Sequence, residues 1–79
     1  MQIAVHVKPA EPIIITTPSI KLDSFLKLCG AVSTGGQAKM LIADGLVRVG
    51  GAVCTQRGKT LVPGDKIAMS GGHWQVAAQ

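Results

Sequence analysis

The fold of this chain is decided by residues 21–59, KLDSFLKLCGAVSTGGQAKMLIADGLVRVGGAVCTQRGK. Along this stretch the apolar residues first recur at helical spacing and then alternate as they do in strands. We therefore predict two short amphipathic helices followed by a β-hairpin, with basic residues where these elements turn.

The first helix is predicted over residues 22–29. Asp23 suits the positive end of the helix dipole in the first turn, and Gly30 is placed to end the helix in a left-handed conformation. The apolar residues recur at i, i+3, i+4 and i+7 and form one stripe. This stripe contains Leu22, Phe25, Leu26 and Cys29.

The second helix is predicted over residues 35–44, because Thr34 and Gln37 have the spacing of a capping box. Such a box satisfies backbone N–H groups that have no partner inside the helix. The residues expected to face the core are Ala38, Leu41 and Ile42.

Gly35 and Gly36 occupy the first turn of this second helix. Glycine in that position lets an anion approach the bare N–H groups closely. The alternative is that the pair only eases a tight turn between the helices, and the sequence favours neither reading.

The hairpin is predicted from two short strands, residues 46–49 and 52–55, joined by Gly50–Gly51 in a two-residue turn. In the first strand Arg48 alternates with valines, as in a half-buried strand. Residues 56–59, QRGK, follow as an exposed turn that we call the basic loop.

In order and spacing these pieces resemble the ribosomal-protein S-four-type RNA-binding domain, also known as the alpha-L RNA-binding motif. The resemblance covers about residues 19–69, and the run GGQAK is most similar to small stand-alone bacterial members. It implies an α+β fold, in which two short helices in the N-terminal half pack on a small, mostly antiparallel β-sheet. The matching positions are residues 21–23, 26, 30, 34–39, 41–42, 45, 47–49, 51, 57–59 and 64–65.

The resemblance also implies a non-catalytic protein that binds RNA through the two-helix face and the basic loop. Many members carry a basic residue at the position of Gly35, so only a backbone contact remains there. The implied partner is RNA, ribosomal or transfer RNA. The scarcity of aromatic residues favours structured RNA over a linear strand, and a monomer is expected. The candidate RNA contacts are Lys21, Lys39, Arg48, Arg57 and Lys59, with the backbone amides of Gly35 and Gly36.

Composition points in the same direction. The 79 residues allow one domain with one modest core, and the net charge of +4 suggests a polyanionic partner. A mild excess of lysine would also serve solubility alone, but no acid lies between Gly45 and Gly64, where Arg48, Arg57 and Lys59 stand. With one Phe, one Trp and no Tyr there is no aromatic platform for reading single strands.

Residues 1–12 are predicted to form an N-terminal extension or an edge strand, and residues 13–79 a single RNA-binding domain. Within the extension, residues 2–7 alternate as a strand and are followed by a proline-containing break. Residues 13–17 are β-branched and form the next predicted strand, which Pro18 ends. Further strands are expected at residues 60–62, 66–69 and 73–76.

A second function class is a protein-interaction adaptor on a ribonucleoprotein complex. The strand at residues 13–17, or the apolar face of residues 2–7, would then pair with the edge of a partner's sheet. An enzyme is disfavoured, because His6 and His73 lie near opposite ends of the chain and the acids are scattered.

No metal or cofactor is expected, since two Cys and two distant His do not make a zinc site. Cys29 and Cys54 are predicted to be small buried residues in a reducing compartment, and Trp74 to pack against the sheet. The sequence shows no signal peptide and no membrane-spanning run, so the cytoplasm is the expected location.

Overall fold

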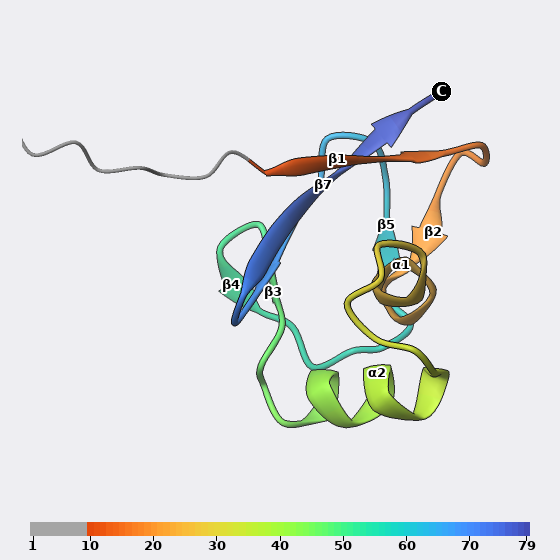
Figure 1. Cartoon of the computed structure of the whole chain (residues 1–79). Coiled ribbons are helices and arrows are strands. Elements are labelled where there is room, and N and C mark those ends of the chain that lie inside the picture. Colours follow the sequence, from red (N-terminus) through yellow and green to blue (C-terminus); the bar gives the residue numbers. More distant parts are fainter. Residues whose placement is uncertain (1–9) are drawn as a thin grey trace, which may run out of the picture.

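Two helices lie against one side of a five-stranded sheet in the computed structural model, which describes residues 10–79 (Figure 1). The strand predicted at residues 2–7, with His6, lies outside the described residues. The helices are α1 (Leu22–Leu28) and α2 (Gly35–Ala43). The strands are β1 (Glu11–Ile15), β2 (Ile20–Lys21), β3 (Arg48–Val49), β4 (Ala52–Val53), β5 (Thr60–Leu61), β6 (Lys66–Met69) and β7 (Gly72–Ala78).

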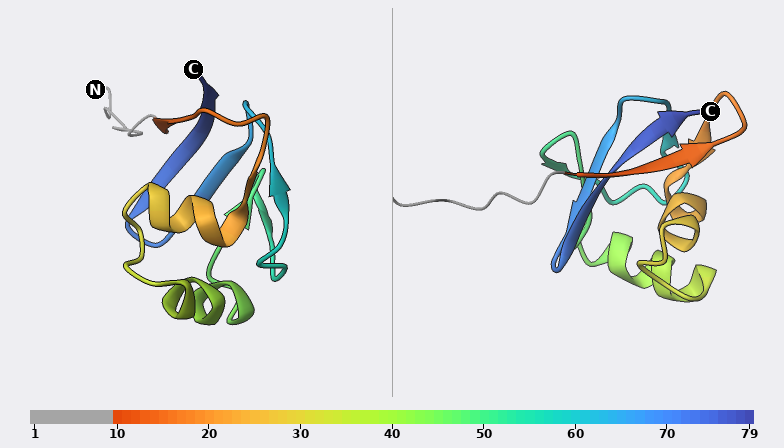
Figure 2. Two further views of the ribbon diagram at one scale, coloured as in Figure 1. Left: turned by 90° about the vertical axis from the view of Figure 1, so that its right-hand side faces the viewer. Right: turned by 45° about the horizontal axis from the view of Figure 1, so that its top comes forward.

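The five-stranded sheet has the order β1-β7-β6-β3-β4. Its first pair, β1 with β7, is parallel, and its other three pairs are antiparallel. β2 and β5 form a separate antiparallel pair beside the start of α1 (Figure 2). The prediction of an α+β fold with a mostly antiparallel sheet is therefore confirmed.

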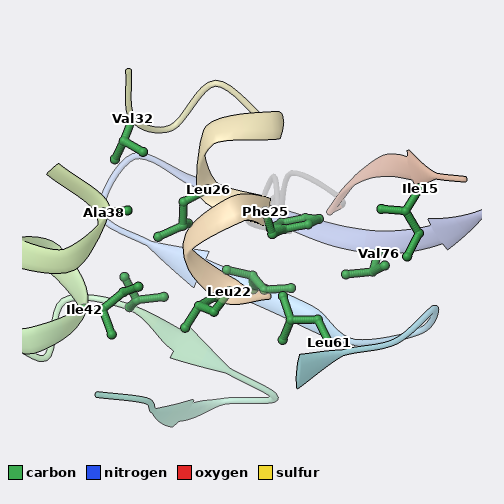
Figure 3. Packing of buried hydrophobic residues seen from close by; sticks show 11 residues of the cluster. Ile15, Leu22, Phe25, Leu26, Val32, Ala38, Ile42, Leu61 and Val76 are labelled. Atoms are coloured by element: carbon green, nitrogen blue, oxygen red, sulfur yellow. The ribbon is translucent and has the colours of Figure 1, made fainter. Parts of the chain in front are cut away.

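The core fills the space between the helices and the sheet (Figure 3). Leu22, Phe25 and Leu26, three residues of the predicted stripe, are fully buried on α1. Isolated helices shorter than about 12 residues are marginal in water, so packing rather than local propensity stabilises α1 and α2. The other core residues are Ala38 and Ile42 from α2, Ile15, Leu61, Ile67 and Val76 from the strands, and Val32 and Val47 from loops.

The predicted helix signals are present in the structure. The Thr34 hydroxyl oxygen accepts a hydrogen bond from the Gln37 amide at 3.2 Å, which caps α2. The Gln37 side chain in turn accepts a hydrogen bond from the Ser33 amide at 2.8 Å, one residue before the N-cap. Gly30, which was predicted to end the first helix, has a positive φ angle of 81°, and Gly45, which follows α2, has one of 74°. Both are in the left-handed conformation that glycine adopts without steric cost.

β1 lies two residues earlier than the predicted strand and runs through Pro12. A proline is tolerated here because β1 is at the edge of the sheet that residues 10–79 form, where its missing N–H can face away from the ladder. In this position Ile15 is buried, Ile13 packs against the core, and Ile14 stays exposed.

Three residues predicted to be buried are only half-buried. Cys29 follows α1 as its C-cap, and Asp44 follows α2, so each helix ends one residue before its predicted end. On α2 the buried pair is Ala38 and Ile42, four residues apart, which leaves Leu41 on the flank of the core. Cys54 also packs at the edge of the core.

No helix among residues 10–79 is long and apolar enough to cross a membrane.

Candidate nucleic-acid interface

The basic loop is anchored to the start of α1 by three hydrogen bonds from residues 21–23. The Leu22 amide donates to the carbonyl oxygen of Lys59 at 2.9 Å, and the Asp23 amide donates to that of Arg57 at 3.2 Å. The Lys21 ammonium donates to the carbonyl oxygen of Gly58 at 3.3 Å. α1 begins without a side-chain cap, so the loop carbonyls accept from N–H groups that the helix cannot satisfy itself.

This anchoring brings together cations that are far apart in the sequence. Lys21 lies opposite Thr60 in the β2–β5 pair, one residue from the end of the basic loop. Because the loop carbonyls accept hydrogen bonds from α1, the loop backbone is fixed while the side chains of Arg57 and Lys59 remain exposed. Three of the predicted contacts therefore lie together beside the start of α1. They are Lys21, Arg57 and Lys59.

The first turn of α2 is open to solvent at Gly35 and Gly36. A Cβ atom added at Gly35 would meet nothing within 4 Å, and one added at Gly36 would meet only the Thr34 hydroxyl, at 3.8 Å. Neither glycine has a positive φ angle. Backbone strain and close packing therefore do not account for the two glycines, and a ligand has room to approach their amides.

Lys39 is exposed on α2 and directly follows the buried Ala38. Both helices lie on the same side of the five-stranded sheet, and the segment between β4 and β5 reaches across to them (Figures 1 and 2). We use the name helix-side surface for the predicted contacts that lie on the helices, at the start of α1 and on the basic loop. These contacts are Lys21, Gly35, Gly36, Lys39, Arg57 and Lys59.

Arg48 is the predicted contact that the structure places elsewhere. In β3 it lies between Val47, which is buried, and Val49, which packs against the core. Successive strand residues point to opposite faces of a sheet, so the exposed Arg48 side chain is on the face away from the helices. Lys66, which was not among the predicted contacts, shares this face because its neighbour Ile67 is buried. The alternation of side chains over residues 66–69, with Ile67 and Met69 facing inward, could have indicated that Lys66 faces outward.

Aromatic and cysteine side chains belong to the core or its edge rather than to an exposed site. Trp74 lies opposite Ile67 in the β6–β7 pair and packs against the core, as predicted. Burial raises the pKa of the Cys29 thiol, which also donates a weak hydrogen bond to the Leu26 carbonyl at 3.5 Å. Among residues 10–79 no three His, Cys, Asp or Glu side chains are grouped as metal ligands.

Comparison with known proteins identifies the class. A family model described as the S4 domain matches residues 13–77, and the chain belongs to this family of domains. Over 61 residues it is 41% identical to a protein of Escherichia coli strain K12 named "Putative RNA-binding protein YbcJ", covering 77% of this chain and 87% of YbcJ. Over 68 residues it is 38% identical to the "Probable ribosome maturation protein RlbA" of Bacillus subtilis strain 168, covering 85% and 96% of the two chains.

Solved structures agree with this assignment. The solution structure of E. coli YbcJ, described as revealing an alpha-L motif involved in RNA binding, matches with a TM-score of 0.69 and 32% identity. The match covers 99% of this chain and 100% of YbcJ. The 30S ribosomal protein S4e of Thermoplasma acidophilum shares the fold, with a TM-score of 0.57 and 22% identity over 76% of this chain and 32% of S4e.

Proposed function

We propose that this chain is a non-catalytic RNA-binding protein that docks structured RNA through the helix-side surface. The observation that carries the proposal is the anchoring of the basic loop at the start of α1. A loop held in this way presents its cations without first losing much conformational freedom, which favours binding.

The contacts would be made mainly to phosphates. Arg57 can hold a phosphate in a bidentate manner, and Lys59 supplies a point charge beside it. The ammonium of Lys21 has three donors, of which Gly58 uses one. The amides of Gly35 and Gly36 would donate hydrogen bonds to a further phosphate at the start of α2. Such contacts fix position on the RNA backbone and do not read bases.

The preference for structured RNA follows from the aromatic residues. Phe25 is fully buried and Trp74 packs against the core. The sequence contains no Tyr and no further Phe or Trp. Recognition of single strands depends on stacking bases on exposed aromatics. Shape and charge of a folded RNA therefore remain as the basis of recognition.

The relatives support a ribosomal RNA as the partner, because RlbA is named for ribosome maturation. A ribosomal or transfer RNA partner would place the protein in the cytoplasm. We further propose that residues 13–79 are the RNA-binding unit, that residues 1–12 are an N-terminal extension or edge strand, of which Glu11 and Pro12 belong to β1, and that the unit binds as a monomer.

The test is the salt dependence of binding to a labelled ribosomal RNA hairpin. If about three or four phosphates are neutralised, the logarithm of the binding constant should fall with the logarithm of salt concentration with a slope of about −2 to −4. Replacing both Arg57 and Lys59 by Glu should abolish binding while the chain still folds, because both side chains are exposed. A binding constant that does not respond to salt would overturn the proposal.

A second candidate function is an adaptor on a ribonucleoprotein. β1 is at the end of the strand order, and Ile14 on it is 60% exposed. A partner strand added at this edge would cover an apolar side chain and gain main-chain hydrogen bonds. Recovery of a protein partner that survives nuclease treatment and is lost with Ile14→Asp would support it.

A further inference from the structure

The face of the five-stranded sheet that points away from the helices carries its own polar cluster. The register places Arg48 opposite Ala68, and Ala68 opposite His73. In the next row Lys66 lies opposite Gln75. Residues paired in this way stand on the same face of a sheet. We call this set, Arg48, Lys66, Ala68, His73 and Gln75, the outer sheet face.

This face is separate from the core. Each neighbour in the chain points the other way: Ile67 is buried, and Val49 and Trp74 pack against the core. Arg48 and Lys66 are exposed, and His73 and Gln75 are half-buried. Ala68, at the centre of the cluster, is small. Together with Arg48 it lines a hollow whose other lining residues are Gly45, Leu46, Met69 and Ser70.

The two cations are diagonal neighbours across the β3–β6 pair, because Lys66 precedes Ala68 by two residues. Diagonal neighbours in an antiparallel pair lie about 7–8 Å apart, which is within reach of long side chains. They can therefore hold adjacent groups of one extended anion, and His73 and Gln75 add hydrogen-bonding groups beside them.

None of the four acids among the described residues occupies the paired rows of this face. Glu11 lies opposite Trp74 in the β1–β7 register, which is the row of the core side. Asp23 is in α1, and Asp44 follows α2. The Asp65 carboxylate accepts a hydrogen bond from the Val62 amide at 2.9 Å in the turn before β6. The outer sheet face is therefore positively charged, and a negatively charged partner complements it.

We propose that the outer sheet face is a second RNA-binding surface, which holds the phosphate backbone of an RNA segment other than the one on the helix-side surface. This goes beyond the proposed function, which uses the helix-side surface alone. Because the two surfaces lie on opposite sides of the sheet, one molecule would bridge two RNA segments. With two cations the second surface neutralises about two phosphates, so its own salt slope should be near −2.

The test is a bridging assay with the full chain. A biotinylated RNA duplex is immobilised and saturated with protein, unbound protein is removed, and capture of a fluorescent copy of the same duplex is measured at low salt. The test variant carries Arg48→Gln and Lys66→Gln. The control carries Thr16→Glu and Gln79→Glu at exposed positions, and it lowers the net charge by the same amount. Thermal melting of each protein confirms that it is folded, and Lys66→Gln alone serves as a milder variant.

Wild type and control should capture the second duplex. The Arg48→Gln and Lys66→Gln protein should lose capture by about five-fold or more, whereas its binding to the immobilised duplex should change by less than about two-fold. The proposal is overturned if that variant captures as well as the control, or if the wild type captures no second duplex. The former result would indicate bridging by a protein dimer, and the latter a face that takes no RNA.

The proposed function is tested separately in the same assay. Arg57→Gln with Lys59→Gln should reduce binding to the immobilised duplex. If binding persists in that protein but falls in the Arg48→Gln and Lys66→Gln protein, the helix-side surface is wrong and the outer sheet face holds the RNA by itself.

Discussion

The ammonium group of Lys21 donates a hydrogen bond to the carbonyl oxygen of Gly58, which is 37 residues further along the chain, at 3.3 Å. This bond joins the N-cap of α1 to the middle of the basic loop. Lys21 therefore has a positioning role in addition to its charge, because it helps to fix the loop that carries Arg57 and Lys59.

A double-mutant cycle measures this role. We expect Lys21→Met to weaken RNA binding by about three- to ten-fold in the wild type, and by much less when Arg57→Ala and Lys59→Ala are already present. The reason is that a positioning residue loses its effect once the groups it positions are removed. Dissociation constants of the variants check the cycle, and hydrogen exchange of the Lys59 amide reports the loop directly. Equal losses in both backgrounds would mean that Lys21 acts only by its own contact with RNA.

The two glycines of α2 offer a variant in which stability and binding should move in opposite directions. Alanine has the higher helix propensity, so Gly35→Ala should stabilise the protein by up to about 1 kcal/mol, and no atom lies within 4 Å of the added Cβ. The methyl group would stand where a phosphate approaches the amides, so RNA affinity should fall. Urea unfolding and RNA titration of the same protein check both signs. Unchanged affinity would remove the start of α2 from the interface.

Two neighbouring residues of α2 should differ in their contribution to stability. Ile42 is 1% exposed, so Ile42→Ala should lower the free energy of unfolding by about 2–5 kcal/mol. Leu41 is only half-buried, and Leu41→Ala should cost less than Ile42→Ala. Denaturant unfolding followed by the fluorescence of Trp74, the one tryptophan of the chain, measures both. If Leu41→Ala lowered the free energy of unfolding more than Ile42→Ala does, α2 would have to be rotated about its axis relative to the structure.

The thiol of Cys29 should make stability fall at alkaline pH. Because burial raises its pKa in the folded state, the unfolded chain loses this proton first as the pH rises through about 8.5. Above that value the folded state binds more protons than the unfolded state, so the free energy of unfolding decreases with pH. Cys29→Ala should start from a lower stability and show a weaker decrease. Equal slopes for the two proteins between about pH 8 and 10 would contradict this.

The sequence predicted the local elements of the fold well. The stripe of α1 and the Thr34–Gln37 cap are encoded by spacings of three or four residues, and both are present. The resemblance to a known family supplied the arrangement of helices on a mostly antiparallel sheet. The position of β1 was not predictable in this way, because a run of isoleucines suits either register and pairing with β7 decides between them.

The candidate site was predicted in composition more than in geometry. Strand alternation showed that Arg48 points out of the core, but not that its side of the sheet is opposite the helices. Lys66 was not among the predicted contacts because it lies outside the positions that carry the resemblance. The anchoring of that loop on α1 depends on backbone groups of Arg57, Gly58 and Lys59, whose partners no side-chain pattern reveals.

The parallel pairing of β1 with β7 also has a consequence for synthesis of the chain. Glu11–Ile15 leaves the ribosome early, but its neighbour in the sheet is Gly72–Ala78. Until those late residues emerge, the nascent chain holds an unpaired, isoleucine-rich segment, and such segments are prone to aggregation. Completion of the sheet must therefore wait for the last strand, and a stop codon before Gly72 should yield an insoluble product.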